Sequence, residues 1–163
     1  MLELRPLSDD DISLVEVWLN KEHIKRWYEI PHIGITIADW MREIQERNGE
    51  FRWITYLIAM YREQPIGLCL YYKCTDSNDE DFGTLPPAGS YGIDYLIGEE
   101  TYLGKCLGKR IIAMLVDKIF SFTDAERVTA EIDKDNKASE KALLSCGFTL
   151  LDVQRSRYVI RKD

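Results

Sequence analysis

The order of hydrophobic patterns along the chain constrains its fold more than any other feature. Residues 53–61 (WITYLIAMY) and 66–74 (IGLCLYYKC) alternate with a period of two around the turn REQP, which predicts a β-hairpin. From residue 90 on, strand-like runs alternate with helix-like runs: strands at 90–98, 127–133, 148–153 and 156–162, helices at 106–123 and 136–146. Strands that lead and helix–strand units that follow predict a mixed sheet in an α+β or α/β arrangement.

The N-terminal part carries helix signals. After a strand-like start, LELRPL, Ser8 is expected to cap a helix that opens with three aspartates, where the helix dipole favours acidic groups. Thr36 is expected to cap a second helix, ended by Gly49. Between them, residues 22–34 are expected to form a broken, aromatic connection, and residues 75–89, rich in Asp, Gly and Pro, an exposed loop.

Composition excludes several classes of protein. A chain of 163 residues with 45% apolar residues fits a single globular domain, without internal repeats, a membrane span or a signal peptide. The net charge of −7 argues against a surface for duplex nucleic acid and suits an amine substrate, although acidity often serves only solubility. The four cysteines show no zinc-binding spacing, so we expect no metal and a reduced, cytoplasmic setting.

The segment 103–110, LGKCLGKR, lies between an expected strand and an expected helix. Amides at a helix N-terminus, two glycines and three basic side chains would together bind a pyrophosphate. The segment is neither a Walker loop nor a dinucleotide fingerprint. The residues alone leave a second interpretation open, a helix cap that uses glycine for close packing.

Farther along, Asn136 opens a helix, and Gly147–Phe148 returns the chain to a strand. Together with the glycine-rich segment, this layout resembles the GNAT superfamily of N-acyltransferases, which use acetyl coenzyme A. In that family the turn Q/R-x-x-G-x-G/A binds the pyrophosphate of coenzyme A. The matching residues here are Leu103, Cys106 and Gly108, so only the last glycine is kept.

A narrower resemblance links the chain to the aminoglycoside 6′-N-acetyltransferases. The segments WLNKEHIKRWY, EQPIGLCLYY and YGIDYLIGEETYLGKCLGKRI carry it, and GID followed by LGKxLGK is its most specific part. Hydroxamate-siderophore acetyltransferases share some of this layout.

The resemblance implies a GNAT fold over residues 1–163, a central mixed, mostly antiparallel sheet of six to seven strands with about four flanking helices. It also implies a set of cofactor-binding residues for acetyl coenzyme A: Leu96, Ile97, Leu103, Gly104, Lys105, Cys106, Leu107, Gly108, Lys109, Asn136 and Ser139.

Amine acetylation requires a deprotonated amine, a polarised thioester and a leaving thiolate. A carboxylate on an apolar strand needs a reason, because burying it unpaired is costly. By resemblance Asp94 faces the substrate amine as an orienting anion or a general base; pairing with an arginine is the alternative. The amides of Leu96 or Ile97 would hold the thioester carbonyl. Leu143 stands where many members have a general-acid tyrosine. Its loss is tolerable either because the coenzyme A thiolate is already an acceptable leaving group, or because Tyr91, Tyr95 or Tyr102 substitutes.

The acceptor is expected to be a cationic small molecule, bound by acidic and aromatic side chains. The candidates are Trp27, Tyr28, Tyr72, Glu80, Asp94 and Glu131. Their alternative roles are ordinary ones, since aromatic residues often belong to the core and acidic loops often only stay solvated. His23 and His32 receive no catalytic role.

The expected function is direct transfer of an acetyl group, in a ternary complex, to the 6′-amine of an aminoglycoside. Two alternatives remain: another acceptor (a siderophore hydroxylamine, a polyamine or a protein N-terminus), or a non-catalytic acyl-CoA-binding module. We expect no nucleic-acid or membrane partner, and a monomer or homodimer.

Overall fold

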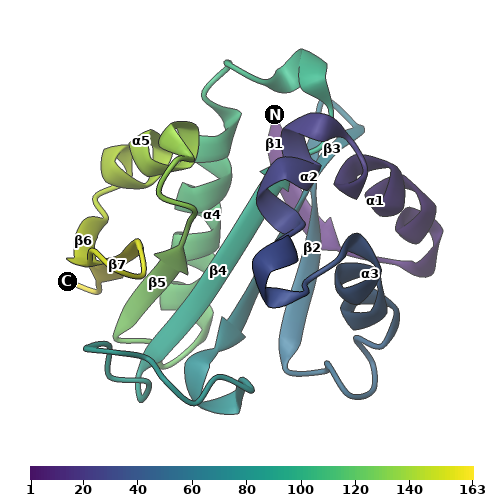
Figure 1. Cartoon of the computed structure of the whole chain (residues 1–163). Coiled ribbons are helices and arrows are strands. Elements are labelled where there is room, and N and C mark those ends of the chain that lie inside the picture. The colour runs from purple at the N-terminus through teal and green to yellow at the C-terminus, as the bar shows by residue number, and fades with distance from the viewer. The chain divides into compact units, whose positions relative to one another are not determined.

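A computed structural model describes all 163 residues of the chain (Figure 1). Seven strands form one sheet in the order β1-β2-β3-β4-β5-β7-β6. The strands are β1 Leu2–Pro6, β2 Ile54–Tyr61, β3 Gln64–Lys73, β4 Ser90–Ile97, β5 Arg127–Glu131, β6 Thr149–Asp152 and β7 Arg157–Arg161. The α-helices are α1 Ile12–Leu19, α2 Glu22–Tyr28, α3 Ile37–Gln45, α4 Leu107–Phe122 and α5 Lys137–Ser145.

The sheet is mixed, as predicted. β1 pairs with β2, β5 with β7, and β6 with β7 in antiparallel register, whereas β4 and β5 run parallel. The predicted hairpin is present, because β2 and β3 are joined by Arg62 and Glu63, both at positive φ, which is typical of a tight two-residue turn.

The main correction to the sequence analysis concerns residues 22–34, which were expected to form a broken connection. Five α-helices are present where about four were expected, because residues 22–28 of the supposed broken connection form α2. Only Ile24 of this short helix is buried, so the segment lacks the repeated apolar stripe by which a helix is recognised in a sequence. Gly49 does not end α3 directly either, since that helix already stops at Gln45.

Three predicted helix caps are confirmed. Ser8 and Asp11 form a capping box around the short 3₁₀ turn Asp9–Asp11 that precedes α1. Thr36 forms a second box with Asp39 at the start of α3. The side chain of Asn136 accepts a hydrogen bond from the amide of Ser139 at the start of α5. At Thr36 and Asn136 the side-chain oxygen accepts from an amide of the first helical turn, whereas at Ser8 the Asp11 carboxylate accepts from the Ser8 amide.

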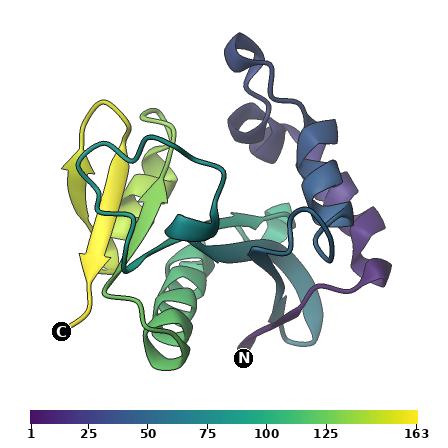
Figure 2. The same cartoon turned by 90° about the horizontal axis from the view of Figure 1, so that it is seen from below.

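The chain divides into two compact units. The first consists of Met1–Leu70 and Tyr95–Lys105, the second of Tyr71–Asp94 and Cys106–Asp163. In the first unit α1 packs against α2 and α3, and Figure 2 shows these purple-to-blue helices grouped together. In the second unit α5 packs against α4 (Figure 1). No helix combines the length and the apolar character that crossing a bilayer requires.

Candidate functional site

The pairing of β4 with its parallel neighbour β5 covers only the first part of β4. The pairing covers only Ser90↔Arg127, Tyr91↔Val128 and Gly92↔Thr129, although β4 continues to Ile97. Asp94 lies two residues beyond the last pair. The pairing therefore ends before the candidate carboxylate, and the edge of β4 that points away from β3 continues over residues 95–97.

Side chains from α2 hold two carbonyls of this edge. The hydroxyl of Tyr28 donates to the carbonyl oxygen of Tyr95 at 3.0 Å, and Nε2 of His23 lies 2.9 Å from the carbonyl oxygen of Ile97. A carbonyl accepts only, so this His23 nitrogen carries the proton. The sequence analysis placed Tyr28 among substrate residues and gave His23 no catalytic role; the hydrogen bonds give both a positioning role on β4.

The amides of Leu96 and Ile97, the two candidates for binding the thioester carbonyl, point to opposite edges of β4. A Cβ added to Gly67 of β3 would lie 2.2 Å from the carbonyl oxygen of Leu96, so the backbone groups of Leu96 face β3. Backbone groups of neighbouring residues in a strand point in opposite directions. The amide of Ile97 therefore faces the edge opposite β3, on the side that His23 approaches, and Ile97 is the better candidate.

A β-bulge ends β4 next to this edge. The amides of Gly98 and Glu99 both donate to the carbonyl oxygen of Ile66, at 2.8 and 3.2 Å. A Cβ at Gly98 would lie 2.1 Å from Cγ of Trp18, which is completely buried and donates from Nε1 to Glu99. Through this contact the WLN segment packs against the end of β4.

The glycine-rich segment is an exposed turn that leads into α4. Leu103, Gly104, Lys105, Cys106 and Lys109 are all exposed, whereas Leu107 is buried and anchors the first turn of the helix. Gly104 has φ +72° and Cys106, the N-cap residue, has φ +60°. Cys106 thus has the left-handed conformation that favours glycine, at the position where the family pattern has one.

Helix α5 begins at the expected asparagine, but it has no general acid at the position of the family's tyrosine. Asn136 Oδ1 lies 3.2 Å from the amide of Ser139. Leu143, at the family's tyrosine position, is completely buried and packs in the core. The possible substitute Tyr91 donates to Asp124 at 3.4 Å, and burial raises its pKa, which makes it a weaker acid.

Three of the predicted acceptor residues gather in the second unit. Tyr72 lies directly over Gly92, since a Cβ there would come within 2.4 Å of its Cζ. Burial raises the pKa of the Tyr72 hydroxyl strongly, and Cys74, Asp79, Asp94 and Glu131 raise it further. Tyr72 is therefore a protonated phenol in the field of several acidic groups, among them Asp94 and Glu131.

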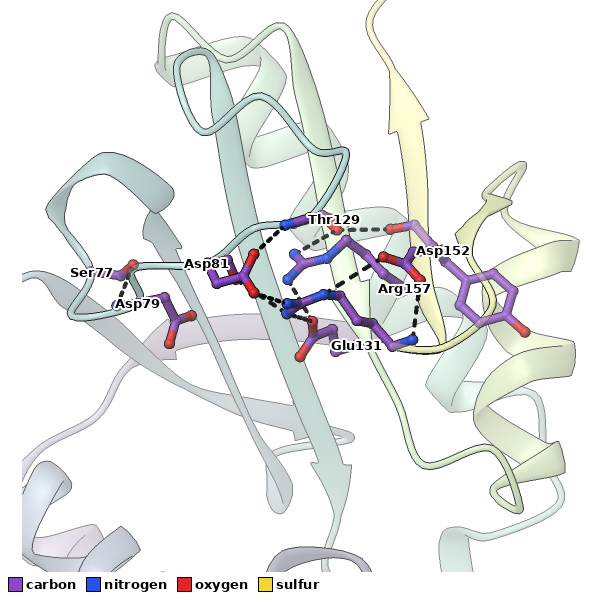
Figure 3. Close-up of polar contacts among 10 residues, drawn as sticks. Ser77, Asp79, Asp81, Thr129, Glu131, Asp152 and Arg157 are labelled. Atoms are coloured by element: carbon purple, nitrogen blue, oxygen red, sulfur yellow. Dashed lines mark hydrogen bonds and ion pairs between the residues drawn. The ribbon is translucent and has the colours of Figure 1, made fainter. Parts of the chain in front are cut away.

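Glu131 belongs to an ionic network that the sequence analysis missed (Figure 3). Its Oε1 lies 2.5 Å from Nη2 of Arg157 and 4.0 Å from Nη1 of Arg155. Arg155 also contacts Asp81 at 2.5 Å and Asp152 at 3.6 Å. The predicted acidic site is thus partly neutralised by two arginines, for which the sequence pattern gave no signal.

Of the remaining acceptor candidates, Trp27 and Tyr28 belong to the first unit and Glu80 to the second. Trp27 is a half-buried residue of α2 with the Arg26 guanidinium 4.7 Å from its ring centroid, and Tyr28 packs edge-to-face on Trp40 at 5.3 Å. Glu80 is exposed in the loop that precedes β4 and makes no ion pair.

Comparison with known proteins identifies the family and its relatives. The model of the acetyltransferase (GNAT) domain matches residues 8–154. Aminoglycoside N(6′)-acetyltransferases type 1 of Klebsiella pneumoniae and Serratia marcescens are each 26% identical over 145 residues, which is 89% of this chain and 72% of theirs.

Solved structures agree with this fold. Aminoglycoside acetyltransferase AAC(6′)-Ib in complex with coenzyme A matches with a TM-score of 0.83 and 24% identity, over 99% of this chain and 95% of the other. A complex of AAC(6′)-Ib with paromomycin and acetyl coenzyme A gives 0.82 and 25%, over 99% and 93%.

Proposed function

This chain belongs to the acetyltransferase (GNAT) family, and we propose that it transfers the acetyl group of acetyl coenzyme A to the 6′-amine of an aminoglycoside. The observation that carries the proposal is that the pairing of β4 with β5 ends at Gly92, two residues before Asp94. The similarity to aminoglycoside N(6′)-acetyltransferases supports the choice of acceptor. Acetylation would remove a positive charge with which the antibiotic binds RNA phosphate.

The turn at residues 103–109 binds the pyrophosphate of coenzyme A in this proposal. Its exposed amides precede the first turn of α4, where the helix dipole favours an anion, and Lys105 and Lys109 add positive charge. The amide of Ile97 faces the edge along which the pantetheine arm would lie, and donates to the thioester carbonyl. Asn136 and Ser139 at the start of α5 complete the proposed cofactor residues.

The chemical step is direct attack by the amine on the thioester. Asp94 orients the amine or accepts its proton, which a primary amine with a pKa near ~10 must lose before it attacks. The new C–N bond forms as the C–S bond breaks, and coenzyme A leaves as a thiolate. A thiol pKa of about 8.5 makes that group an acceptable leaving group, so the step proceeds without an acid at Leu143.

The proposal is tested by release of free thiol from acetyl coenzyme A in the presence of different acceptors. Kanamycin-type aminoglycosides, spermidine, a siderophore hydroxylamine and a peptide N-terminus form the panel. We expect the highest kcat/KM with the aminoglycosides. A higher value with any other acceptor would replace the aminoglycoside assignment.

A second candidate is favoured by the burial of Leu143, which removes the usual general acid. In that case the chain would bind acyl-CoA without turnover. Calorimetry with coenzyme A, run beside the acceptor panel, separates this candidate, because it predicts binding of the cofactor with no thiol release for any acceptor.

A further inference from the structure

Arg155 lies in the turn between β6 and β7, and its guanidinium contacts the acidic side chains around Glu131. We propose that Arg155 is a specificity-determining residue: its guanidinium occupies the acidic acceptor subsite when no substrate is bound, and a polycationic acceptor displaces it. This inference rests on the proposed function, because it assigns Glu131 to acceptor binding.

All three guanidinium nitrogens of Arg155 lie near oxygen atoms of acidic residues. One nitrogen, Nη2, lies 2.5 Å from Oδ2 of Asp81, and Nη1 donates to the carbonyl oxygen of the same residue at 3.1 Å. Nε lies 3.6 Å from Asp152, and Nη1 lies 4.0 Å from Glu131. The guanidinium therefore has oxygen atoms from three acidic residues around it, as an acceptor ammonium group would need.

Arg157 is a structural arginine by comparison. Its side chain is only 5% exposed, and it reaches Glu131 at 2.5 Å and the hydroxyl of Thr129 at 3.4 Å (Figure 3). Glu131 and Arg157 are direct cross-strand partners in the β5–β7 register. Removal of Arg157 would leave a buried site without its cation, so Arg157 is not displaced by a ligand.

Arg155 differs in exposure and in the length of its contact with Glu131. Its side chain is 32% exposed, that of Asp81 is 77% exposed and that of Glu131 is 47% exposed. Exposed ion pairs of this kind contribute little to stability. Both arginines contact Oε1 of Glu131, which leaves Oε2 for a ligand.

The net charge of the network predicts whether removal of Arg155 strengthens or weakens the binding of a cation. The carboxylates of Asp81, Glu131 and Asp152 face the guanidinium groups of Arg155 and Arg157, so their net charge is −1. Without Arg155 the net charge would be −2. A cation that enters the subsite competes with Arg155 for the same oxygens, and an acceptor with one amine has no second cation with which to compete.

The variant Arg155→Gln removes the competing charge and keeps a side chain of similar length. We expect it to bind kanamycin about fivefold more tightly than the wild type, the scale of one exposed ion pair, and to lower the KM for kanamycin by the same factor. The kcat and the KM for a monoamine should stay unchanged. Arg155→Lys, which keeps the charge, should resemble the wild type.

Arg161→Gln is the matched control, because Arg161 is an exposed arginine at the end of β7 that makes no ion pair. It changes the net charge equally but touches no residue of the network. The affinity for kanamycin is measured by calorimetry at low and high salt with coenzyme A present, and thermal melting confirms that each variant is folded. The increase in kanamycin affinity that Arg155→Gln produces should be smaller at high salt, because salt screens the interaction between exposed charges.

Two results would overturn the proposal. Weaker kanamycin binding by Arg155→Gln would make Arg155 a residue that orders the site for the acceptor, and an affinity equal to that of Arg161→Gln would give Arg155 no specific role. Binding is measured apart from turnover. An absence of acetyl transfer to kanamycin therefore refutes the proposed function, while the affinities still decide the role of Arg155.

Discussion

The turn that precedes α4 and the acidic network around Glu131 are built in different ways. At the turn, backbone conformation matters: Gly104 and Cys106 have positive φ, and exposed residues lead into the helix. In the network, side chains matter: Glu131 is paired with Arg157, and Arg155 is paired with Asp81, 74 residues away in the sequence.

This difference determines how each region responds to a change of sequence. A site made of main-chain amides tolerates sequence change, as Cys106 in a glycine conformation illustrates. A site made of charged side chains changes its ligand when one residue changes. The turn therefore carries the family pattern, and in the proposal the network determines which acceptor this chain binds.

The largest expected effect separates acceptor chemistry from cofactor binding. Asp94→Asn keeps the shape of the side chain but removes the carboxylate, so we expect kcat to fall about 10²- to 10³-fold, the scale of a lost general base. The affinity for coenzyme A should stay unchanged in calorimetry. Unchanged turnover in this variant would remove Asp94 from the mechanism.

The next effect tests how tightly the acceptor region is packed. Gly92→Ala places a Cβ 2.4 Å from Cζ of the half-buried Tyr72, so the free energy of unfolding should drop by about 1–3 kcal/mol. Urea titration measures the change. Gly49→Ala is the control, because its Cβ would meet nothing closer than 3.7 Å. Equal stabilities of the two variants would contradict the close contact between Tyr72 and Gly92.

A smaller change in the free energy of unfolding should distinguish a buried ion pair, which stabilises the fold, from an exposed one, which does not. The Arg5 guanidinium, 2.7 Å away, lowers the pKa of the largely buried Asp11 from its ordinary value to about 2. A lowered pKa stabilises the folded state above the unfolded pKa near ~3.9, and the stabilisation is lost as pH falls from there through about 2.

Asp11→Asn should therefore reduce the free energy of unfolding by about 2 kcal/mol at pH 7, and the difference from wild type should disappear near pH 2. Asp81→Asn, whose side chain is 77% exposed, should barely change stability at any pH. Denaturant titrations across this pH range measure both variants. A large loss for Asp81→Asn would make the pair with Arg155 structural and weaken its assignment as a displaceable contact.

The smallest effect tests the turn itself. Cys106→Gly relieves a left-handed residue and should raise the free energy of unfolding by about 0.5–1 kcal/mol. Gly104→Ala should lower it by about 1 kcal/mol through conformation alone, since no atom lies within 4 Å of the added Cβ. Thermal melting compares the two. Stabilisation by Gly104→Ala would show that this turn does not hold its positive φ.

The sequence predicted features that depend on local pattern. The caps at Ser8, Thr36 and Asn136 follow from neighbours within three residues, and the strands follow from alternation. Contacts between distant segments were not predictable. The pairing of Glu131 with Arg157 requires the β5–β7 register, and the hydrogen bond of His23 to Ile97 joins residues 74 positions apart.

The acetylated product tests the proposed transfer most directly. Kanamycin is incubated with the protein and acetyl coenzyme A, and mass spectrometry and NMR locate the new acetyl group. We expect one acetyl group, on the 6′ nitrogen, formed only when acetyl coenzyme A is present. An acetyl group on another nitrogen, or unmodified kanamycin beside protein that binds coenzyme A, would contradict the assignment.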